Sequence, residues 1–249
     1  MPQLNIAAYL FMPLTELNLL AGGIREQCAD HGLKGSVLIA PEGINLFLAG
    51  IERGVEEFIT WLRSDPRFAA LLAKRSYSSD QPFKKLLVKV KQQIVPMGIH
   101  NLPVNSNSAQ RIDAFALRAM LDADDDIVLL DTRNTFEFEL GSFSTATHLN
   151  IGTFRSFPEA VANRLEHWRK KTVVTFCTGG IRCEKAAPLM EKLGFSKVLQ
   201  LDGGILKYFE LCQSTHYRGA CFVFDERRTL NAQLLPTSES RQTYRTGGA

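Results

Sequence analysis

Residues 172–182, Thr-Val-Val-Thr-Phe-Cys-Thr-Gly-Gly-Ile-Arg, decide the fold of the second half of the chain. The first five of them are apolar or β-branched and predict a buried strand. Residues 183–193 then carry apolar side chains at helical spacing and predict a helix. Cys177 therefore lies where a strand ends, and Arg182 lies where a helix begins. The two glycines between them allow a tight turn and a close approach of the backbone to a ligand.

The loop between this strand and this helix predicts a reactive cysteine. Backbone N–H groups of such a loop point inward, and the helix dipole adds partial positive charge. Both stabilise a thiolate, which is the nucleophilic form of cysteine. The alternative is a structural cysteine in an ordinary turn, but the paired glycines and the arginine favour the reactive one. We predict that Cys177 is a reactive cysteine, in a loop with Thr178, Gly179, Gly180, Ile181 and Arg182.

Length and composition indicate an ordinary globular protein. The 249 residues suggest two domains, and 45% apolar with 22% charged residues is typical of globular chains. No apolar run approaches the ~20 residues that a membrane helix needs, so no membrane association is expected. The first residues, Met-Pro-Gln-Leu-Asn, lack the basic start and apolar core of a signal peptide. These features predict a cytoplasmic protein.

The cysteines and histidines predict no metal site. The five cysteines are odd in number and scattered, which argues against a disulfide framework. No pair has the Cys-x-x-Cys spacing of zinc sites, and no His-x-Asp or His-x-Glu pairing suggests an iron triad. No Gly-x-Gly-x-x-Gly run follows a strand, so no flavin or nicotinamide site is predicted. The net charge of +3 is too small to imply a nucleic-acid partner by itself.

Residues 1–96 predict a ferredoxin-like α+β domain. Their pattern is strand, helix, strand, strand, helix, strand, which is the order of that fold. Strands are expected at residues 3–10, 34–40, 45–49 and 69–78, and helices at residues 14–31 and 54–64. Residues 83–95 then alternate apolar and basic side chains, as a half-buried strand does.

A second pattern begins after a linker, which the Asn, Ser, Pro and Gly of residues 97–111 indicate. Residues 112–213 predict an α/β domain with a central parallel sheet. Cys177 then lies at the carboxyl end of a strand, where ligands bind to such sheets. Residues 214–249 are basic and polar and are expected to form a C-terminal tail. Strands are further expected at residues 127–131 and 197–201, and helices at residues 114–121, 160–170 and 205–212.

The second domain resembles the rhodanese family. The resemblance rests on Leu-Asp-Thr-Arg-Asn at 130–134, on the loop at 177–182, and on Leu-Asp-Gly-Gly at 201–204. In that family the loop cysteine accepts a sulfur atom as a persulfide. A loop of six positions from cysteine to arginine suits sulfur, whereas related phosphatases use one residue more. The resemblance therefore disfavours a phosphatase.

Nearly the whole chain is similar to a closer family, the rhodanese-domain tRNA uridine hydroxylases. The segments that carry this similarity are residues 35–45, 88–91, 94–98, 131–134, 177–185, 201–205 and 221–227. The resemblance implies an oxidoreductase that forms 5-hydroxyuridine at the wobble position of tRNA. It implies molecular oxygen as co-substrate with no evident cofactor, tRNA as the partner, and no stable protein partner. Many members carry a cysteine-rich tail, but this chain has no cysteine after Cys221.

The resemblance implies that Cys177 is the catalytic residue, and for a hydroxylase the simplest hypothesis is that it takes part covalently. The positions of the residues around it suggest their roles. Cys177 either adds to C6 of the uracil ring or carries an oxidised sulfur. Arg182 either holds an anion in the loop or forms a salt bridge at the start of the helix. Asp131 and Arg133 are expected to brace the loop by ion pairing, with Glu137 as a candidate partner. Cys183 either resolves an oxidised Cys177 or packs against the sheet.

The predicted strand at residues 83–95 contains four lysines, Lys84, Lys85, Lys89 and Lys91. The same run contains no acidic residue. Positive charge on one face is what contacts to an RNA backbone need. The alternative is a solvated edge strand whose lysines deter aggregation. With the family resemblance, RNA binding is the favoured interpretation.

Two other functions stay open. One is a sulfurtransferase that moves a persulfide sulfur to a small acceptor or to tRNA. The other is a non-catalytic RNA-binding module with a vestigial rhodanese domain, although the intact Cys177 and Arg182 argue against it.

Overall fold

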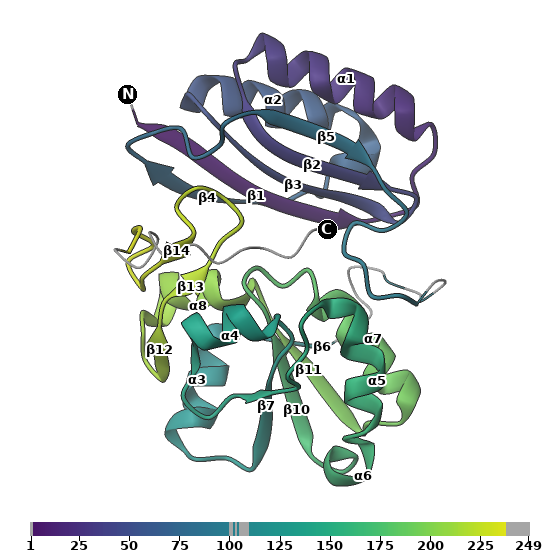
Figure 1. The fold of residues 1–249 in the computed structure, drawn as a ribbon, viewed down its shortest axis with the longest axis vertical. Helices are drawn as coiled ribbons and strands as arrows, with labels where there is room; N and C mark the ends of the chain where they lie inside the picture. Colours follow the sequence, from purple (N-terminus) through teal and green to yellow (C-terminus); the bar gives the residue numbers. More distant parts are fainter. Residues whose placement is uncertain (1, 100–101, 103, 105–109, 238–249) are drawn as a thin grey trace.

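The computed structural model describes residues 2–99, 102, 104 and 110–237. Figure 1 shows two domains stacked on each other, with the first domain above the second. The yellow segment around residues 221–230 lies at one side of the junction between them. Within the described residues, no helix is both long and apolar enough to cross a membrane.

The first domain is a five-stranded sheet with two helices on one face (Figure 1). Its strand order is β4-β1-β3-β2-β5, and the first four strands have the predicted ferredoxin-like connections. The edge strand β5 pairs in parallel with β2. The elements are β1 (Gln3–Phe11), α1 (Leu17–Asp30), β2 (Lys34–Ala40), β3 (Gly43–Gly50), α2 (Glu52–Ser64), β4 (Ala73–Ser78) and β5 (Leu86–Val90).

Alternation along the strands divides this sheet into two faces. Ile6 and Ala8 of β1 and Leu46 and Leu48 of β3 are buried in the core beneath the helices. The residues between them on each strand point the other way, toward the second domain. This second face, which we call the open face, is the one that contributes to the site described below.

The second domain has a central parallel sheet of order β6-β11-β10-β7-β9. One core packs under α5 and α7 and a second under α3 and α8, so both faces of the sheet are covered (Figure 1). The elements are β6 (Gln110–Ile112), α3 (Ala114–Asp122), β7 (Ile127–Asp131), α4 (Thr135–Leu140), β8 (Gly141–Phe143), β9 (Thr147–His148), α5 (Phe157–Ala162), α6 (Leu165–Trp168), β10 (Thr172–Phe176), α7 (Cys183–Leu193), β11 (Lys197–Leu201) and α8 (Gly204–Cys212).

Several element boundaries differ from the predicted ones. The single helix expected at residues 160–170 is wrong, because two short helices occupy residues 157–168, the first with a proline in its first turn. The strand expected at residues 83–95 is confined to Leu86–Val90. Most of the predicted linker, residues 97–111, lies outside the described residues, but Gln110 and Arg111 belong to β6.

The described part of the expected tail is structured. It contains β12 (Tyr217–Gly219), which pairs with β8, and β13 (Cys221–Phe222), which pairs with β14 (Thr229–Leu230). The chain between β13 and β14 reaches the first domain, where the Glu226 N–H donates to the carbonyl of Pro82 at 3.0 Å. This segment therefore joins the two domains.

Candidate active site

The loop after β10 places Cys177 at the junction of two helices. The Sγ of Cys177 accepts a hydrogen bond from the Gly180 N–H at 3.1 Å. The carbonyl of Cys177 accepts from the Ile205 N–H at the start of α8. Gly180 has φ +100°, and a Cβ there would lie 2.8 Å from the hydroxyl of Tyr9. The loop thus needs glycine at this position both for its backbone conformation and for space.

The surroundings of Cys177 favour its thiolate. Burial alone would raise the pKa of this thiol. A hydrogen bond from the Cys183 thiol, the charge of Arg182, and the N–H groups of Arg182 and Gly180 outweigh burial and hold the pKa of Cys177 well below its usual range. The structure therefore places beside Cys177 the groups that favour its thiolate, and its catalytic role stays a prediction.

Cys183, in the first turn of α7, has the opposite tendency. Burial and its hydrogen bond to Cys177 raise the pKa of Cys183 well above its usual range. Its Sγ also lies 3.8 Å from the Thr132 hydroxyl. One thiol of the pair is thus poised to ionise while the other stays protonated and donates to it.

Arg182 forms the salt bridge at the start of the helix. Its guanidinium donates to both carboxylate oxygens of Glu137, at 2.6 and 2.8 Å, and both side chains are buried. Glu137 in turn accepts from the Asn134 N–H at the start of α4. Of the two roles considered for Arg182, the structure contains the ion pair, and its charge still acts on Cys177.

Asp131 and Arg133 pair with each other rather than with Glu137. Their closest atoms are 2.6 Å apart, and both side chains are fully buried. The predicted partnership with Glu137 is wrong, because Arg182 occupies that carboxylate. Between the pair, the Thr132 N–H donates to the carbonyl of Phe176 at 3.0 Å. The ion pair therefore holds the residue that precedes Cys177.

Two side chains of the first domain reach this loop. The hydroxyl of Tyr9 donates to Glu184 at 3.0 Å, and burial and Glu184 raise the pKa of Tyr9, so that its proton is retained. The Nζ of Lys74 donates to the carbonyls of Gly179 and Gly203. Sequence reasoning missed both residues. Strand alternation could have placed them on one face, but no signal linked that face to the loop.

Three of the segments quoted for the family resemblance meet at the domain junction. Lys185, in α7, forms a 2.8 Å ion pair with Glu42 and donates to the carbonyl of Val95. Glu42 also accepts from the Ile94 N–H at 2.8 Å. Segments 35–45, 94–98 and 177–185 are therefore parts of one interdomain contact.

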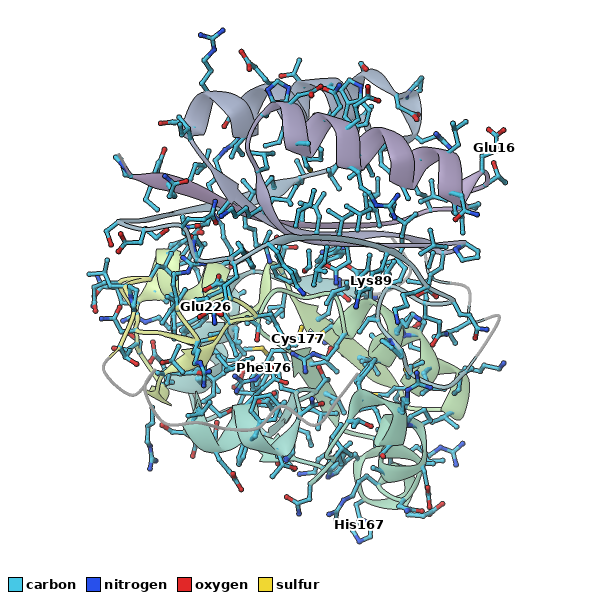
Figure 2. The ribbon with its side chains drawn as sticks, turned by 45° about the horizontal axis from the view of Figure 1, so that its top comes forward. Glu16, Lys89, His167, Phe176, Cys177 and Glu226 are labelled. Carbon is cyan, nitrogen blue, oxygen red and sulfur yellow. The ribbon has the colours of Figure 1, made fainter. Side chains whose placement is uncertain are left out.

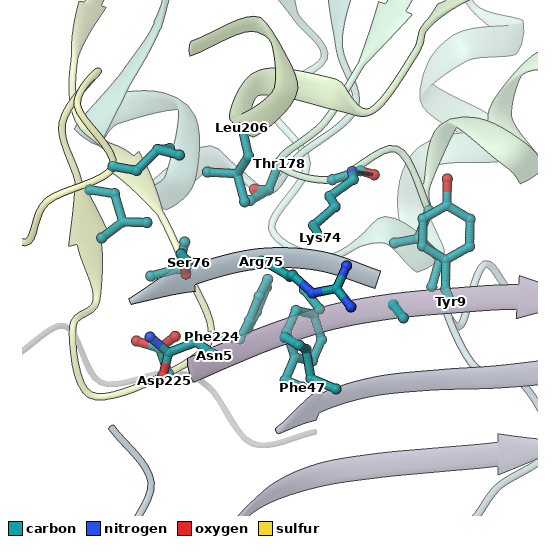
Figure 3. A pocket seen from close by; sticks show the side chains of 18 of the residues that line it. Asn5, Tyr9, Phe47, Lys74, Arg75, Ser76, Thr178, Leu206, Phe224 and Asp225 are labelled. Carbon is teal, nitrogen blue, oxygen red and sulfur yellow. Dashed lines mark hydrogen bonds between the residues drawn. The ribbon is translucent and has the colours of Figure 1, made fainter. Parts of the chain in front are cut away.

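A pocket lies between the domains and reaches Cys177 (Figure 3). The first domain contributes residues of β1, β3 and β4, among them Tyr9, Phe47 and Lys74. The second domain contributes the loop, and the segment after β13 contributes Phe224. The pocket walls are mostly apolar side chains. The pocket can therefore take a planar, partly apolar ligand beside the loop, while the Cys177 side chain itself is fully buried.

The four predicted RNA-binding lysines lie outside this pocket, on and beside β5. Lys84 is 3.8 Å from Glu226. Lys85, Lys89 and Lys91 are exposed and form no ion pair with any residue that the structure describes. Figure 2 shows Lys89 on the side of the sheet that faces the second domain. Among the described residues, no three His, Cys, Asp or Glu side chains are grouped as a metal site would require.

Comparison with known proteins agrees with this two-part architecture. Residues 4–94 match the model of the UPF0176 acylphosphatase like domain, and residues 113–211 match that of the rhodanese-like domain. A protein of Cupriavidus taiwanensis named tRNA uridine(34) hydroxylase is 47% identical over 93% of this chain and 84% of its own length. One of Bordetella parapertussis with the same name is 50% identical over 93% of this chain and 97% of its own. With identity at this level along both domains, the chain belongs to the tRNA uridine(34) hydroxylase family.

Proposed function

We propose that the chain hydroxylates the wobble uridine of tRNA to 5-hydroxyuridine, with molecular oxygen as co-substrate and Cys177 as the catalytic residue. The names of relatives that match both domains support the reaction. The structural observation that carries the proposal is the position of Cys177. Its surroundings stabilise its thiolate, and it lines a pocket to which both domains contribute. We place the reaction in the cytoplasm.

The environment of Cys177 supports addition of its sulfur to C6 of the uracil ring. A thiolate is the nucleophile that such an addition needs. The addition turns C5 into an enolate carbon, which attacks an electrophilic oxygen. Loss of the C5 proton and departure of the sulfur from C6 then restore the ring, now with a C5–OH bond. Molecular oxygen supplies one oxygen atom, and the other leaves as water after taking up two protons and two electrons, the electrons coming from an external reductant.

The remaining side chains hold this arrangement. The Arg182–Glu137 pair fixes the end of the loop and adds positive charge beside the sulfur. Lys74 and Tyr9 tie the loop and the adjoining helix to the first domain. The reaction thus depends on both domains, although the sulfur belongs to the second.

The decisive experiment is nucleoside analysis of tRNA from a deletion strain in which no other route forms 5-hydroxyuridine. The wild-type chain should restore the modification, and Cys177→Ala should not. Cys212→Ala removes a buried sulfur elsewhere in the same domain, so it should restore the modification and serves as the matched control. Undiminished 5-hydroxyuridine in the deletion strain would overturn the proposal.

The rhodanese-like domain supports one alternative function, sulfur transfer, which can be tested directly. A sulfurtransferase would transfer sulfur from thiosulfate to cyanide with robust turnover that requires Cys177. That result, together with unchanged tRNA modification in the deletion strain, would favour sulfur transfer over hydroxylation.

A further inference from the structure

The open face of the first sheet continues the pocket beyond Cys177. Strand register arranges its side chains in two rows that run across the strands. The first row is Tyr9, Asn45, Leu38 and Lys89. The second row is Lys74, Ala7, Phe47, Ser36 and Leu87. Each row begins at a residue next to the Cys177 loop, since Tyr9 lies against Gly180 and Lys74 donates to Gly179.

Phe47 presents an aromatic surface within the pocket that holds Cys177. Its ring is partly exposed, and the ring of Phe224 lies 6.2 Å away at a tilt of 44°. Phe224, from the segment after β13, is 49% exposed. Figure 3 shows the two rings near each other in the pocket wall. Partly exposed aromatic rings on a sheet are surfaces on which unstacked bases pack.

Asn45 adds hydrogen-bonding capacity beside Phe47. It lines the same pocket, one row closer to Tyr9. Its side-chain amide makes no hydrogen bond with any residue in the described part of the chain. An amide offers both donors and an acceptor, which match the alternating groups on the edge of a nucleobase. This partly exposed amide is therefore available to a polar ligand.

Lys89 ends the first row at the exposed edge of the sheet. Three strand spacings, about 14 Å, separate it from Tyr9. This span accommodates a short single-stranded segment with one end at Cys177. Lys89 is exposed and has no ion-pair partner among the described residues. Its charge is thus available to a phosphate.

We infer that the open face binds the unpaired nucleotides of the substrate RNA, with a base stacked on Phe47 and hydrogen-bonded to Asn45. The base is that of nucleotide 34, and Lys89 contacts the backbone of the adjoining nucleotides. This inference rests on the proposed function, because it assigns a binding surface for the same substrate. It adds two recognition residues, Phe47 and Asn45, both from the first domain. The first domain then binds the RNA while the rhodanese-like domain supplies the sulfur.

The test measures binding without turnover. The full-length chain is titrated, in the absence of oxygen, into two fluorescein-labelled anticodon stem–loop RNAs that differ only at position 34. One carries uridine there, and the other carries an abasic nucleotide. Wild-type chain should bind the uridine RNA about 5- to 150-fold more tightly, which is the range expected for one stacked base. Phe47→Leu should remove most of that difference and leave binding of the abasic RNA unchanged.

Matched variants exclude a general loss of structure. Phe47→Tyr keeps an aromatic ring and should retain the preference for uridine. Phe115→Leu changes an exposed ring on α3, outside the pocket, and should bind both RNAs as the wild type does. Asn45→Ala should weaken binding of the uridine RNA only. Equal wild-type affinity for the two RNAs, or an unchanged preference in Phe47→Leu, overturns the inference.

These results are independent of the proposed reaction. If uridine-dependent binding is found while the deletion strain keeps its 5-hydroxyuridine, the surface is real and the hydroxylase assignment is wrong. If the modification is lost in the deletion strain but the two RNAs bind equally, the reaction stands and the base is held elsewhere.

Discussion

The Nζ of Lys74, on β4 of the first domain, lies 2.6 Å from the carbonyl oxygen of Gly203 in the second. The same ammonium group donates to the carbonyl of Gly179, two residues after Cys177. Burial lowers the pKa of Lys74, and the charge of the nearby Cys177 opposes that effect. One lysine therefore connects the first domain to the Cys177 loop and to the turn that precedes α8.

Replacing Lys74 should impair both stability and activity. Lys74→Met leaves two partly buried carbonyls without their donor, and hydrogen bonds to charged groups contribute about 1.5–3 kcal/mol each. We expect a lower unfolding temperature and at least a tenfold loss of tRNA hydroxylation. Lys74→Arg, which retains a cation, should recover part of the activity. Lys197→Met, at an exposed lysine, is the control, and an effect as large as that of Lys74→Met would contradict this role.

The pKa of Cys177 can be measured through its alkylation. Because that pKa is held below its usual range, the thiolate and hence the rate with iodoacetamide should persist at pH values where an ordinary cysteine, with a pKa of ~8.5, is protonated. The rate should fall only as pH decreases through the lowered pKa.

Cys183→Ala should shift this profile to higher pH, because it removes the thiol that donates to Cys177. Cys183→Ser keeps a donor and should leave the midpoint near that of the wild type. If Cys183 instead acts by forming a disulfide with an oxidised Cys177, the serine variant would lose activity without a change in the alkylation midpoint.

Removing only one partner of the Arg182–Glu137 ion pair should strongly reduce the free energy of unfolding. Arg182→Met leaves a buried carboxylate without its cation, a change that typically costs about 3–5 kcal/mol of folding free energy. The double variant Arg182→Met/Glu137→Leu removes both charges and should lose less stability than the single one. Chemical denaturation of the three proteins tests this order, and a double variant as unstable as the single one would contradict it. Both variants should raise the pKa of Cys177, since the Arg182 charge is gone.

The organisation of the second domain followed from local patterns in the sequence. The apolar strand before Cys177, the two glycines and the helix after Arg182 are neighbours in the chain, so their geometry is encoded within residues 172–193. The same holds for the strand order of the first domain, which its βαββαβ pattern implies.

The parts that could not be predicted depend on contacts between distant residues. Lys74 and Gly179 are 105 residues apart, and nothing in either local pattern relates them. Glu137 was a candidate partner for Arg133, but Arg133 pairs with Asp131 and Glu137 pairs with Arg182. Only packing decides which of them share a carboxylate. The segment after Cys212 appeared to be a polar tail because its strands are two or three residues long.

The salt dependence of RNA affinity should distinguish lysines that contact RNA from lysines that are only exposed on the edge strand. Each phosphate contact in a single-stranded complex contributes about 0.7 to the slope of log affinity against log salt concentration. Lys89→Gln should therefore reduce the slope for the anticodon stem–loop by about 0.7 and weaken binding to the uridine and abasic RNAs alike. Lys84→Gln is the matched control on the same segment: Lys84 lies 3.8 Å from Glu226, so its charge is partly compensated and its loss should change the slope less. Equal slopes for wild type and Lys89→Gln would place the RNA backbone away from β5, and the lysines would then serve only to keep this edge strand from pairing with other chains.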